Sequence, residues 1–198
     1  MNCSIIDQVS KHVIGFLRKH LPSNRTFHDI THTRSVVKAA EEIAGNCNLS
    51  EQKKEEIILA AWFHDCGHVY RCESHEDISE SLAREFLESI NFPKQRIENV
   101  VACIRATRLP HQPQTLPEKV MCDADLYHLS IPQYPTVLRK LRAEFESLSH
   151  KKFQDDEWEA VNLRFLRNHK YFTNYGQATL ESRKQKNIQR LQEVCSRK

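Results

Sequence analysis

Residues 57–68 read IILAAWFHDCGH, an apolar run that ends in an adjacent histidine and aspartate, His64 and Asp65. The run has the composition of a buried helix, yet it closes with two side chains that are costly to bury without partners. Imidazole nitrogen and carboxylate oxygen are both good ligands for divalent cations. The stretch therefore predicts a buried helix that carries part of a metal site.

Candidate partners for this pair lie upstream and downstream. His32 occurs in FHDITHT, residues 27–33, and Asp123 and Asp125 occur in MCDADLYHL, residues 121–129. Taken singly, His32 reads as a core or helix-terminal histidine, and either aspartate reads as a turn or N-cap residue. Taken together, on three separate helical segments, these residues favour a metal site. His32, His64 and Asp65 are three of its candidate ligands, and either Asp123 or Asp125 is the fourth.

Helical periodicity surrounds these motifs from end to end, and no segment has the alternation of a strand. In the helix that contains the His-Asp pair, His64 and His68 fall on one face, four residues apart. The stretch LPHQPQTLP, with three prolines, predicts a loop at 109–117. The predicted helices cover about 6–20, 31–46, 50–68, 78–90, 93–104, 118–129, 138–148, 158–165 and 178–195.

The size and composition of the chain suit one globular domain. It has 198 residues, 39% hydrophobic and 28% charged, and its four glycines are too few for a fold full of tight turns. We predict an all-α fold, a single-domain helical bundle over 1–198. Its motifs lie in a core at 27–130, and the helices of 131–198 pack on that core.

The sequence offers no membrane span or export signal. No apolar stretch approaches the roughly 20 residues needed to cross a bilayer, and the N-terminus MNCSIIDQVSKH lacks the apolar core of a signal peptide. Seven cysteines are scattered without a C-x-x-C, which favours reduced thiols over disulfides. We therefore expect a cytoplasmic protein. Cys66 and Cys72 flank the His-Asp pair, but their spacing fits no usual zinc knuckle or ribbon.

The net charge of +3 is unevenly distributed. Residues 1–136 contain 15 Lys or Arg against 18 Asp or Glu, whereas residues 137–198 contain 14 against 8. A basic C-terminal third could attract anionic substrates or contact nucleic acid. Solvated helix faces account for most of these side chains, so we do not expect nucleic acid as a partner.

The ordered set His32, His64–Asp65 and Asp125 resembles the motifs of the HD-domain superfamily of metal-dependent phosphohydrolases. The resemblance implies a bundle of the HD-domain type in which these four residues bind one divalent metal ion, namely Mn, Fe, Co, Ni, Zn or Mg. Asp125 is preferred over Asp123 because alanine directly precedes the ligand aspartate in many relatives. The implied activity is hydrolysis of a phosphate ester of a small molecule by metal-activated water, with a nucleotide as leading candidate.

Three further histidines gain roles from the resemblance. His68 occupies an offset where some relatives have glutamate, so with Asp65 it is assigned to catalysis, positioning water or protonating the leaving oxygen. His75 lies in a segment similar to the one that follows the signature pair in many relatives, and in two-metal members it helps to hold a second ion. Those members also have a histidine where this chain has CIRATR, so we expect one ion, with His75 near the phosphate or in the outer shell of the ion. His28, one turn before His32, is expected to contact substrate or to support a ligand, and not to bind the metal itself.

Phosphate recognition is assigned to arginine, because guanidinium binds phosphate in a bidentate manner. Each candidate also reads as a surface arginine. The sequence Arg142-Ala-Glu144-Phe145 resembles an R-x-E-[Y/F] segment in a subgroup of uncharacterised predicted phosphohydrolases of the superfamily, which extends the resemblance into the C-terminal helices. The candidates are Arg71, Arg105, Arg108 and Arg142.

Two other functions stay open. An HD-type di-iron oxygenase begins with the same ligands and needs six, so it would recruit His75 and His111. A non-catalytic nucleotide or nucleic-acid binding module would use the basic C-terminal helices. A phosphohydrolase remains the first hypothesis, with a small phosphorylated substrate as its partner, no membrane partner, and an exposed helical face that could form a homodimer.

Overall fold

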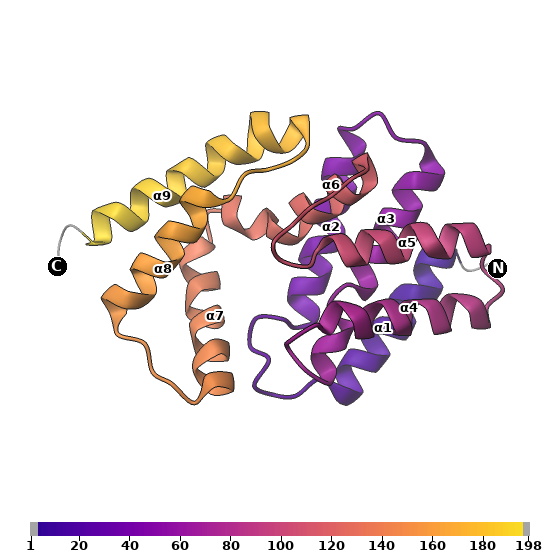
Figure 1. The fold of residues 1–198 in the computed structure, drawn as a ribbon, viewed down its shortest axis with the longest axis horizontal. Helices are drawn as coiled ribbons and strands as arrows, with labels where there is room; N and C mark the ends of the chain where they lie inside the picture. Colours follow the sequence, from indigo (N-terminus) through magenta and orange to yellow (C-terminus); the bar gives the residue numbers. More distant parts are fainter. Residues whose placement is uncertain (1–3, 196–198) are drawn as a thin grey trace.

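The structure, a computed structural model, describes residues 4–195, with side chains up to residue 193. Within that range it contains nine α-helices and three short 3-10 or π-helical turns without any strand, which confirms the all-α prediction (Figure 1). The helices are α1 (Ile5–His20), α2 (Ile30–Gly45), α3 (Glu51–Phe63), α4 (His75–Ser89), α5 (Lys94–Ala106), α6 (Leu116–Asp125), α7 (Tyr134–Ser149), α8 (Asp155–Asn168) and α9 (Glu181–Cys195).

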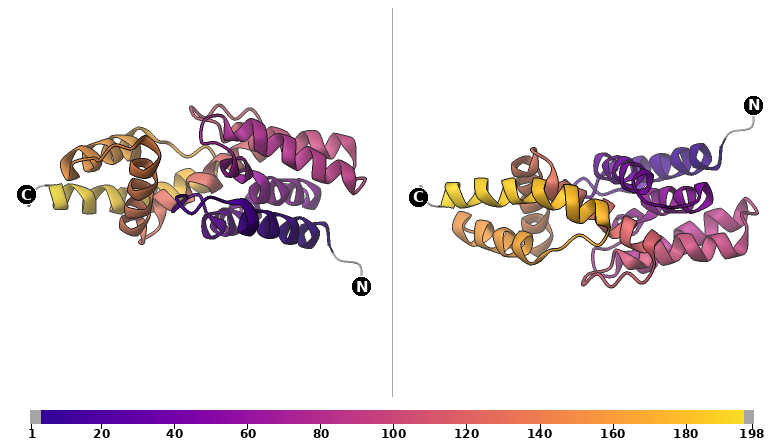
Figure 2. Two further views of the ribbon diagram at one scale, coloured as in Figure 1. Left: turned by 90° about the horizontal axis from the view of Figure 1, so that it is seen from below. Right: turned by 90° about the horizontal axis from the view of Figure 1, so that it is seen from above.

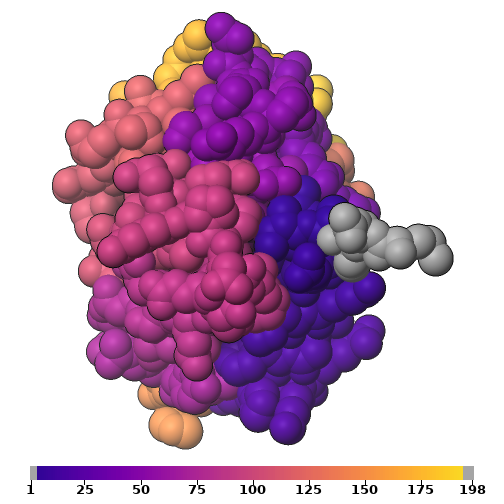
Figure 3. All heavy atoms as spheres, turned by 90° about the vertical axis from the view of Figure 1, so that its right-hand side faces the viewer, coloured from indigo at the N-terminus to yellow at the C-terminus, as the bar shows by residue number. Residues whose placement is uncertain are grey.

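Helices α1 to α6 surround the larger of two apolar cores. Fully buried side chains from α1, α2, α3 and α5 meet there, and each contributes about 1.5–3 kcal/mol when it leaves water; among them are Val13, Ile43, Ile57 and Ile97. Both views in Figure 2 place α7, α8 and α9 beyond one end of this bundle. Figure 3 shows the other end, where α1, α4 and α5 face the viewer.

A smaller apolar core joins the C-terminal helices to the 3-10 turn η2 (Leu126–Ser130), which directly follows α6. Polar contacts accompany this core: Asn187 of α9 donates to the carbonyls of Leu129 and Ile131 at η2, and within the C-terminal helices the buried Lys184 ammonium donates to the His169 carbonyl. The prediction of one domain over 1–198 stays a prediction. The members of the smaller core are Leu126, Leu129, Tyr134, Leu138, Leu166, Ile188 and Leu191.

Local capping sets where the motif-bearing helices begin. The Asp29 carboxylate accepts a hydrogen bond from the backbone N–H of His32 at 2.9 Å, so α2 starts immediately before the first candidate ligand. Ser50 caps α3 in the same way, and Thr115 caps α6. Helix α6 ends at Asp125, with Leu126 as its C-cap residue. The predicted starts of α2 and α3 agree with the structure to within about one residue.

The predicted helix over 50–68 is wrong in its last turn. Helix α3 ends at Phe63, and the chain continues as a 3-10 turn, η1 (Cys66–Val69). Gly67 lies so close to the start of α4 that a Cβ on it would sit 2.0 Å from the carbonyl oxygen of His75. Because this approach interrupts the helix, His68 does not share a continuous α-helical face with His64.

Other predicted boundaries also shift. The helix predicted over 118–129 ends at Asp125, where the chain continues as the 3-10 turn η2, and the helices predicted from 78 and 138 begin at His75 and Tyr134. The loop predicted at 109–117 is shorter, because Leu116 and Pro117 already belong to the first turn of α6, a position that tolerates proline. The helix predicted over 178–195 begins as a π-helical turn, η3 (Gly176–Leu180), before α9. The side chain of Cys195, at the end of this predicted helix, lies outside the described residues. No helix in the described range is both long and apolar enough to cross a bilayer.

Candidate metal centre

Four predicted ligands converge at the ends of three helices. His32 lies in the first turn of α2, His64 and Asp65 directly follow α3, and Asp125 ends α6. The Asp65 Oδ2 atom lies 3.3 Å from His32 Nε2 and 3.2 Å from His64 Nε2. Asp125 Oδ1 lies 3.4 and 3.5 Å from the same two nitrogens. The structure therefore brings these four side chains together.

The donor atoms of this group fit a divalent cation. His32 Nε2, His64 Nε2 and Asp65 Oδ2 are buried, and none has a hydrogen-bond partner. Burying a polar atom without a hydrogen-bond partner costs free energy of folding. Atoms of this kind that face one another therefore indicate a site where a cation binds. Four ligands at about 2.1 Å from an ion in tetrahedral geometry are about 3.4 Å apart. The four histidine–carboxylate separations, 3.2, 3.3, 3.4 and 3.5 Å, match that spacing.

Hydrogen bonding orients His64 toward the same point. Its Nδ1 atom lies 2.9 Å from the carbonyl oxygen of Ala61. A carbonyl oxygen only accepts, so Nδ1 must carry the hydrogen and donate it. In neutral His64 the lone pair is then on Nε2, which faces Asp65 and Asp125 as a metal ligand requires.

The electrostatics of the site favour a proton on His64 when no cation is bound. Burial, the strongest influence, lowers the pKa of His64, but Asp65 and Asp125 outweigh it and raise the pKa well above its usual value. Burial also raises the pKa of Asp65, but His64 and His75 outweigh it and hold this pKa well below the usual range. The two carboxylates thus attract positive charge, which a proton or a metal ion can supply.

We expect binding of Zn²⁺ or Mn²⁺ at pH 7 to release about one proton per ion, because the cation displaces the proton from His64. Affinity should rise with pH until His64 is deprotonated without metal. Isothermal titration calorimetry in buffers of different ionisation enthalpy measures the released proton directly. A binding enthalpy that does not vary with the buffer would contradict this expectation.

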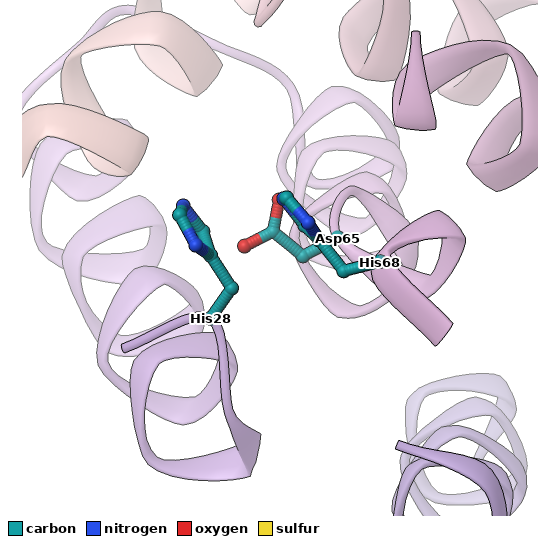
Figure 4. Close-up of side chains that lie close together, drawn as sticks. All are labelled: His28, Asp65 and His68. Atoms are coloured by element: carbon teal, nitrogen blue, oxygen red, sulfur yellow. The ribbon is translucent and has the colours of Figure 1, made fainter. Parts of the chain in front are cut away.

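A second group of histidines faces the other oxygen of Asp65. His75 Nε2 lies 3.3 Å and His68 Nε2 lies 3.8 Å from Asp65 Oδ1. The imidazole rings stack, with centroids 4.2 Å apart for His28 and His68 and 3.9 Å apart for His68 and His75. Figure 4 shows His28 and His68 beside the Asp65 carboxylate. Ligand atoms of His28, Asp65 and His68 lie within 4.8 Å of one another, so they also form a group that could hold a cation.

The three stacked histidines differ in protonation. His75 Nδ1 donates to the Cys72 carbonyl at 2.9 Å. Neither ring nitrogen of His68 has a hydrogen-bond partner, and burial lowers the pKa of His68 to about 3. Burial lowers the pKa of His28 as well, but Glu144 and Asp65 outweigh it and raise this pKa above the usual value. The stack therefore places a neutral ring between two that gain protons more readily.

Glu144 on α7 is a site residue to which the sequence analysis gave no role. Its side chain is buried, and it accepts hydrogen bonds from the backbone N–H groups of Phe27 and His28 at 2.8 and 3.1 Å. It also lies 2.5 Å from His28 Nδ1. These contacts fix His28 and tie the C-terminal helices to the site. A carboxylate beside apolar residues in the helix predicted over 138–148 could have indicated a buried Glu144, but not its contact with His28.

We expect Glu144→Gln to lower kcat/KM by about 10- to 100-fold while the bound metal is retained, as for other partners that orient site residues. One amide oxygen cannot accept from all three donors that Glu144 serves. Glu146→Gln is the matched control on the same helix, because Glu146 pairs with Arg142 and Lys152 instead. Equal activity of the two variants in phosphate-release assays would remove Glu144 from the site.

Both groups border a cleft of about 610 Å³. His28, Asp65, His75 and Asp125 line one wall, and side chains of α7 and α8 line the opposite wall. His128, which sequence reasoning also missed, lines the cleft and donates from Nδ1 to the Asp125 carbonyl at 3.1 Å. Its place three residues after Asp125 in the motif was the available signal.

The predicted phosphate-binding arginines do not gather at this cleft. Arg105 pairs with Glu80, and Arg142 pairs with Glu146 and Asp155. Arg71 is exposed, and none of these three arginines lines the cleft. Arg108 does line it, with its guanidinium paired to Asp77. As substrate contacts, Arg71, Arg105 and Arg142 stay predictions that this geometry does not support.

Asp123 and Asp125 have different environments. The buried Asp123 carboxylate accepts from the backbone N–H groups of Phe172 and Thr173 at 2.8 and 2.9 Å, and from the Thr173 hydroxyl at 2.7 Å. It therefore holds the segment between α8 and η3 against α6. Because these bonds occupy both of its oxygens, the geometry favours Asp125 as the fourth ligand.

The cysteines do not contribute to either group of candidate ligands within the described residues. Buried Cys66 lies next to Asp65, but its thiol points to the Trp62 carbonyl at 3.8 Å, and burial raises its pKa. A raised pKa disfavours the thiolate that zinc binding needs. The five cysteines whose side chains are described are all free, as predicted: Cys47, Cys66, Cys72, Cys103 and Cys122.

Comparison with known families locates the same region. A family model described as HD domain matches residues 29–130, which is more than half of the chain. The match contains the four converging ligands as well as His68 and His75. A comparison with the curated proteins gave no match.

Proposed function

The chain belongs to the HD-domain family of metal-dependent phosphohydrolases, and from this premise we propose that it hydrolyses a phosphate ester of a small molecule, with a nucleotide as leading candidate. We propose one divalent cation, held by His32, His64, Asp65 and Asp125. The observation that carries the proposal is the group of three buried, unpartnered donor atoms that converge with Asp125.

The proposed reaction is attack of water on phosphorus. A new P–O bond forms to the water oxygen as the water loses one proton, the bond to the ester oxygen breaks, and the leaving oxygen takes up one proton to become an alcohol. A divalent cation at this position would lower the pKa of a bound water and neutralise charge on the phosphate. Asp65, whose two oxygens face both histidine groups, would set the relative position of cation and substrate.

The stacked histidines supply complementary hydrogen-bonding groups. With a pKa of about 3, His68 is neutral at pH 7 and suits the positioning of water better than the protonation of a leaving oxygen. His28 has a raised pKa and is held by Glu144, so it is the better proton donor. We propose that His75, whose Nε2 faces Asp65, contacts the phosphate beside them.

Metal analysis of the purified protein tests the proposal, together with a phosphate-release screen with added Mn²⁺, Co²⁺, Ni²⁺ and Mg²⁺. About one ion per chain and metal-dependent release would support it. Two ions per chain would assign an ion to the group of His28, Asp65 and His68 as well. No ion under any loading condition would contradict the ligand assignment.

The rival functions have weaker support. A di-iron oxygenase would need His111 as a ligand, but its Nε2 donates to the Thr107 carbonyl at 3.0 Å, and His111 belongs to neither candidate group within the described residues. A binding module would use the basic pocket lined by Arg183, Lys186 and Arg190, which lies apart from the matched ligands. Cytoplasmic location and a homodimer are carried forward as proposals, the former on the free cysteines.

A further inference from the structure

The wall of the cleft opposite the metal centre is apolar and largely aromatic. It is built from α7, α8 and the segment between them, whereas His28, Asp65, His75 and Asp125 line the facing wall. A substrate with its phosphate at the metal centre would therefore extend its organic part toward this wall. The apolar wall comprises Leu141, Phe145, Phe153, Trp158, Val161 and Phe165.

Exposed apolar side chains are concentrated in this cleft. Phe145 is 50% exposed, Val161 is 54% exposed and Phe165 is 37% exposed, and all three line the cleft, as does Leu109 at 60%. Only two other large apolar residues are similarly exposed in the described part of the chain. Clustered exposed apolar side chains beside a polar site indicate a binding surface for an apolar group.

The charges of the cleft argue against additional phosphates on the substrate. Among the described residues that line it, Arg108 is the single arginine or lysine. The Arg108 guanidinium is paired with Asp77, and it lies 3.7 Å from Glu76. Glu73 also lines the cleft. Beyond the histidines and the proposed cation, additional phosphates would meet carboxylates and, among the described lining residues, no unpaired arginine or lysine, so the organic part of the substrate should be uncharged.

The aromatic side chains favour a flat ring over an alkyl chain. The Phe145 and Trp158 rings are tilted with centroids 5.9 Å apart, and Phe153 and Trp158 are tilted at 5.2 Å. Half-exposed Phe145 and Phe165 leave ring surface available for stacking or edge contacts, which aromatic groups satisfy best. The buried Trp158 Nε1–H has no acceptor, and an acceptor atom on a ring substituent would supply one, whereas an alkyl chain would not.

We infer that α7 and α8 form the pocket for the organic part of the substrate, and that the substrate is a monophosphate ester carrying an uncharged aromatic ring system. This inference rests on the proposed phosphohydrolase activity. It assigns to the C-terminal helices the selection of substrate, while residues 29–130 supply the metal ligands.

Kinetics with two alkyl phosphates of different organic parts test the inference. We expect Phe165→Ala to raise KM for 2-naphthylmethyl phosphate by about tenfold, within the range found when an aromatic stacking partner is removed. The kcat for that ester, and kcat/KM for glycerol 3-phosphate, should stay near the wild-type values. Phe145→Ala should behave like Phe165→Ala. Leu116→Ala is the control, because Leu116 is similarly exposed but lies outside the cleft.

A binding measurement separates this inference from the proposed activity. The alcohol 2-naphthylmethanol has no phosphate, so its binding to the full chain does not require turnover. Quenching of Trp158 fluorescence is the measure of that binding. Trp158→Phe identifies the signal, because Trp62, the other tryptophan, lies in α3 and does not line the cleft. Binding that Phe165→Ala weakens, in a protein that hydrolyses no ester, would refute the activity and retain the pocket.

Two results would overturn the inference. One is that the wild-type protein hydrolyses both esters, while Phe165→Ala and Phe145→Ala leave KM for the naphthyl ester unchanged. The other is a wild-type dimer that Phe165→Ala converts to a monomer, in size-exclusion chromatography with light scattering, without a change in KM. That outcome would mean that a second copy of the chain covers the apolar wall.

Discussion

Replacing Asp65 with asparagine is expected to reduce the bound metal from about one ion per chain to none. It should also lower phosphate release by more than about 100-fold, because loss of a ligand exceeds the 10- to 100-fold cost of losing a residue that orients one. Asp65 lies 3.2 Å from His64, 3.3 Å from His32 and 3.3 Å from His75, whereas Asp125 lies near His32 and His64 alone among these three. Elemental analysis and steady-state assays measure both effects.

Asp123→Asn is the matched control for this experiment. Asp123 is another buried aspartate, two residues from Asp125, but its oxygens accept three hydrogen bonds from Phe172 and Thr173. An asparagine retains one acceptor oxygen, so we expect the free energy of unfolding to fall by about 1–2 kcal/mol with the metal still bound. Metal loss in Asp123→Asn, or metal retention in Asp65→Asn, would reassign the ligands.

Gly67→Ala is expected to lower the free energy of unfolding by about 3 kcal/mol, at the upper end of the cost of overpacking. An alanine Cβ would sit 2.0 Å from the His75 carbonyl oxygen and 2.8 Å from its carbonyl carbon. These are backbone atoms at the start of α4, so relief requires α4 to move away from η1. The movement would also separate His75 from Asp65, and we expect activity to fall with stability. Urea denaturation and phosphate release measure the two losses.

Gly15→Ala provides the control for glycine replacement. Gly15 is exposed within α1, and a Cβ there would meet nothing within 4 Å. Because alanine has the higher helix propensity and restricts the unfolded chain, this variant should gain about 0.5–1 kcal/mol of stability. If Gly67→Ala proved as stable as Gly15→Ala, the close approach of η1 to α4 would be refuted.

Much of the fold could be predicted because helical periodicity is a property of neighbouring residues. The apolar spacing and the caps at Asp29 and Ser50 lie within a few residues of the helices they define. The prediction failed at 64–68, where the apolar and His residues continued a helical pattern but the chain leaves the α-helix. What interrupts that pattern is the backbone of His75, which reaches Gly67 only after the chain has turned.

The candidate site likewise has features that the sequence revealed and features that depend on the tertiary structure. His32, His64, Asp65 and Asp125 carry ligand chemistry that is visible in their residue types and order. The role of Glu144 was not visible, because 116 residues separate it from His28 and only the packing of α7 brings the two together. The arginines show the reverse case: their chemistry suited phosphate, but Arg105 and Arg142 are paired with carboxylates elsewhere.

The sequence by itself therefore determined the helical class of the fold and which side chains are candidate metal ligands, because both depend on side-chain chemistry and short-range spacing. Only the tertiary structure decided that Asp65 lies between two histidine groups, that Asp123 has a structural role, and that an aromatic wall faces the metal centre. Those features arise from contacts between segments distant in the chain. Such contacts depend on how whole helices pack, which no local pattern encodes.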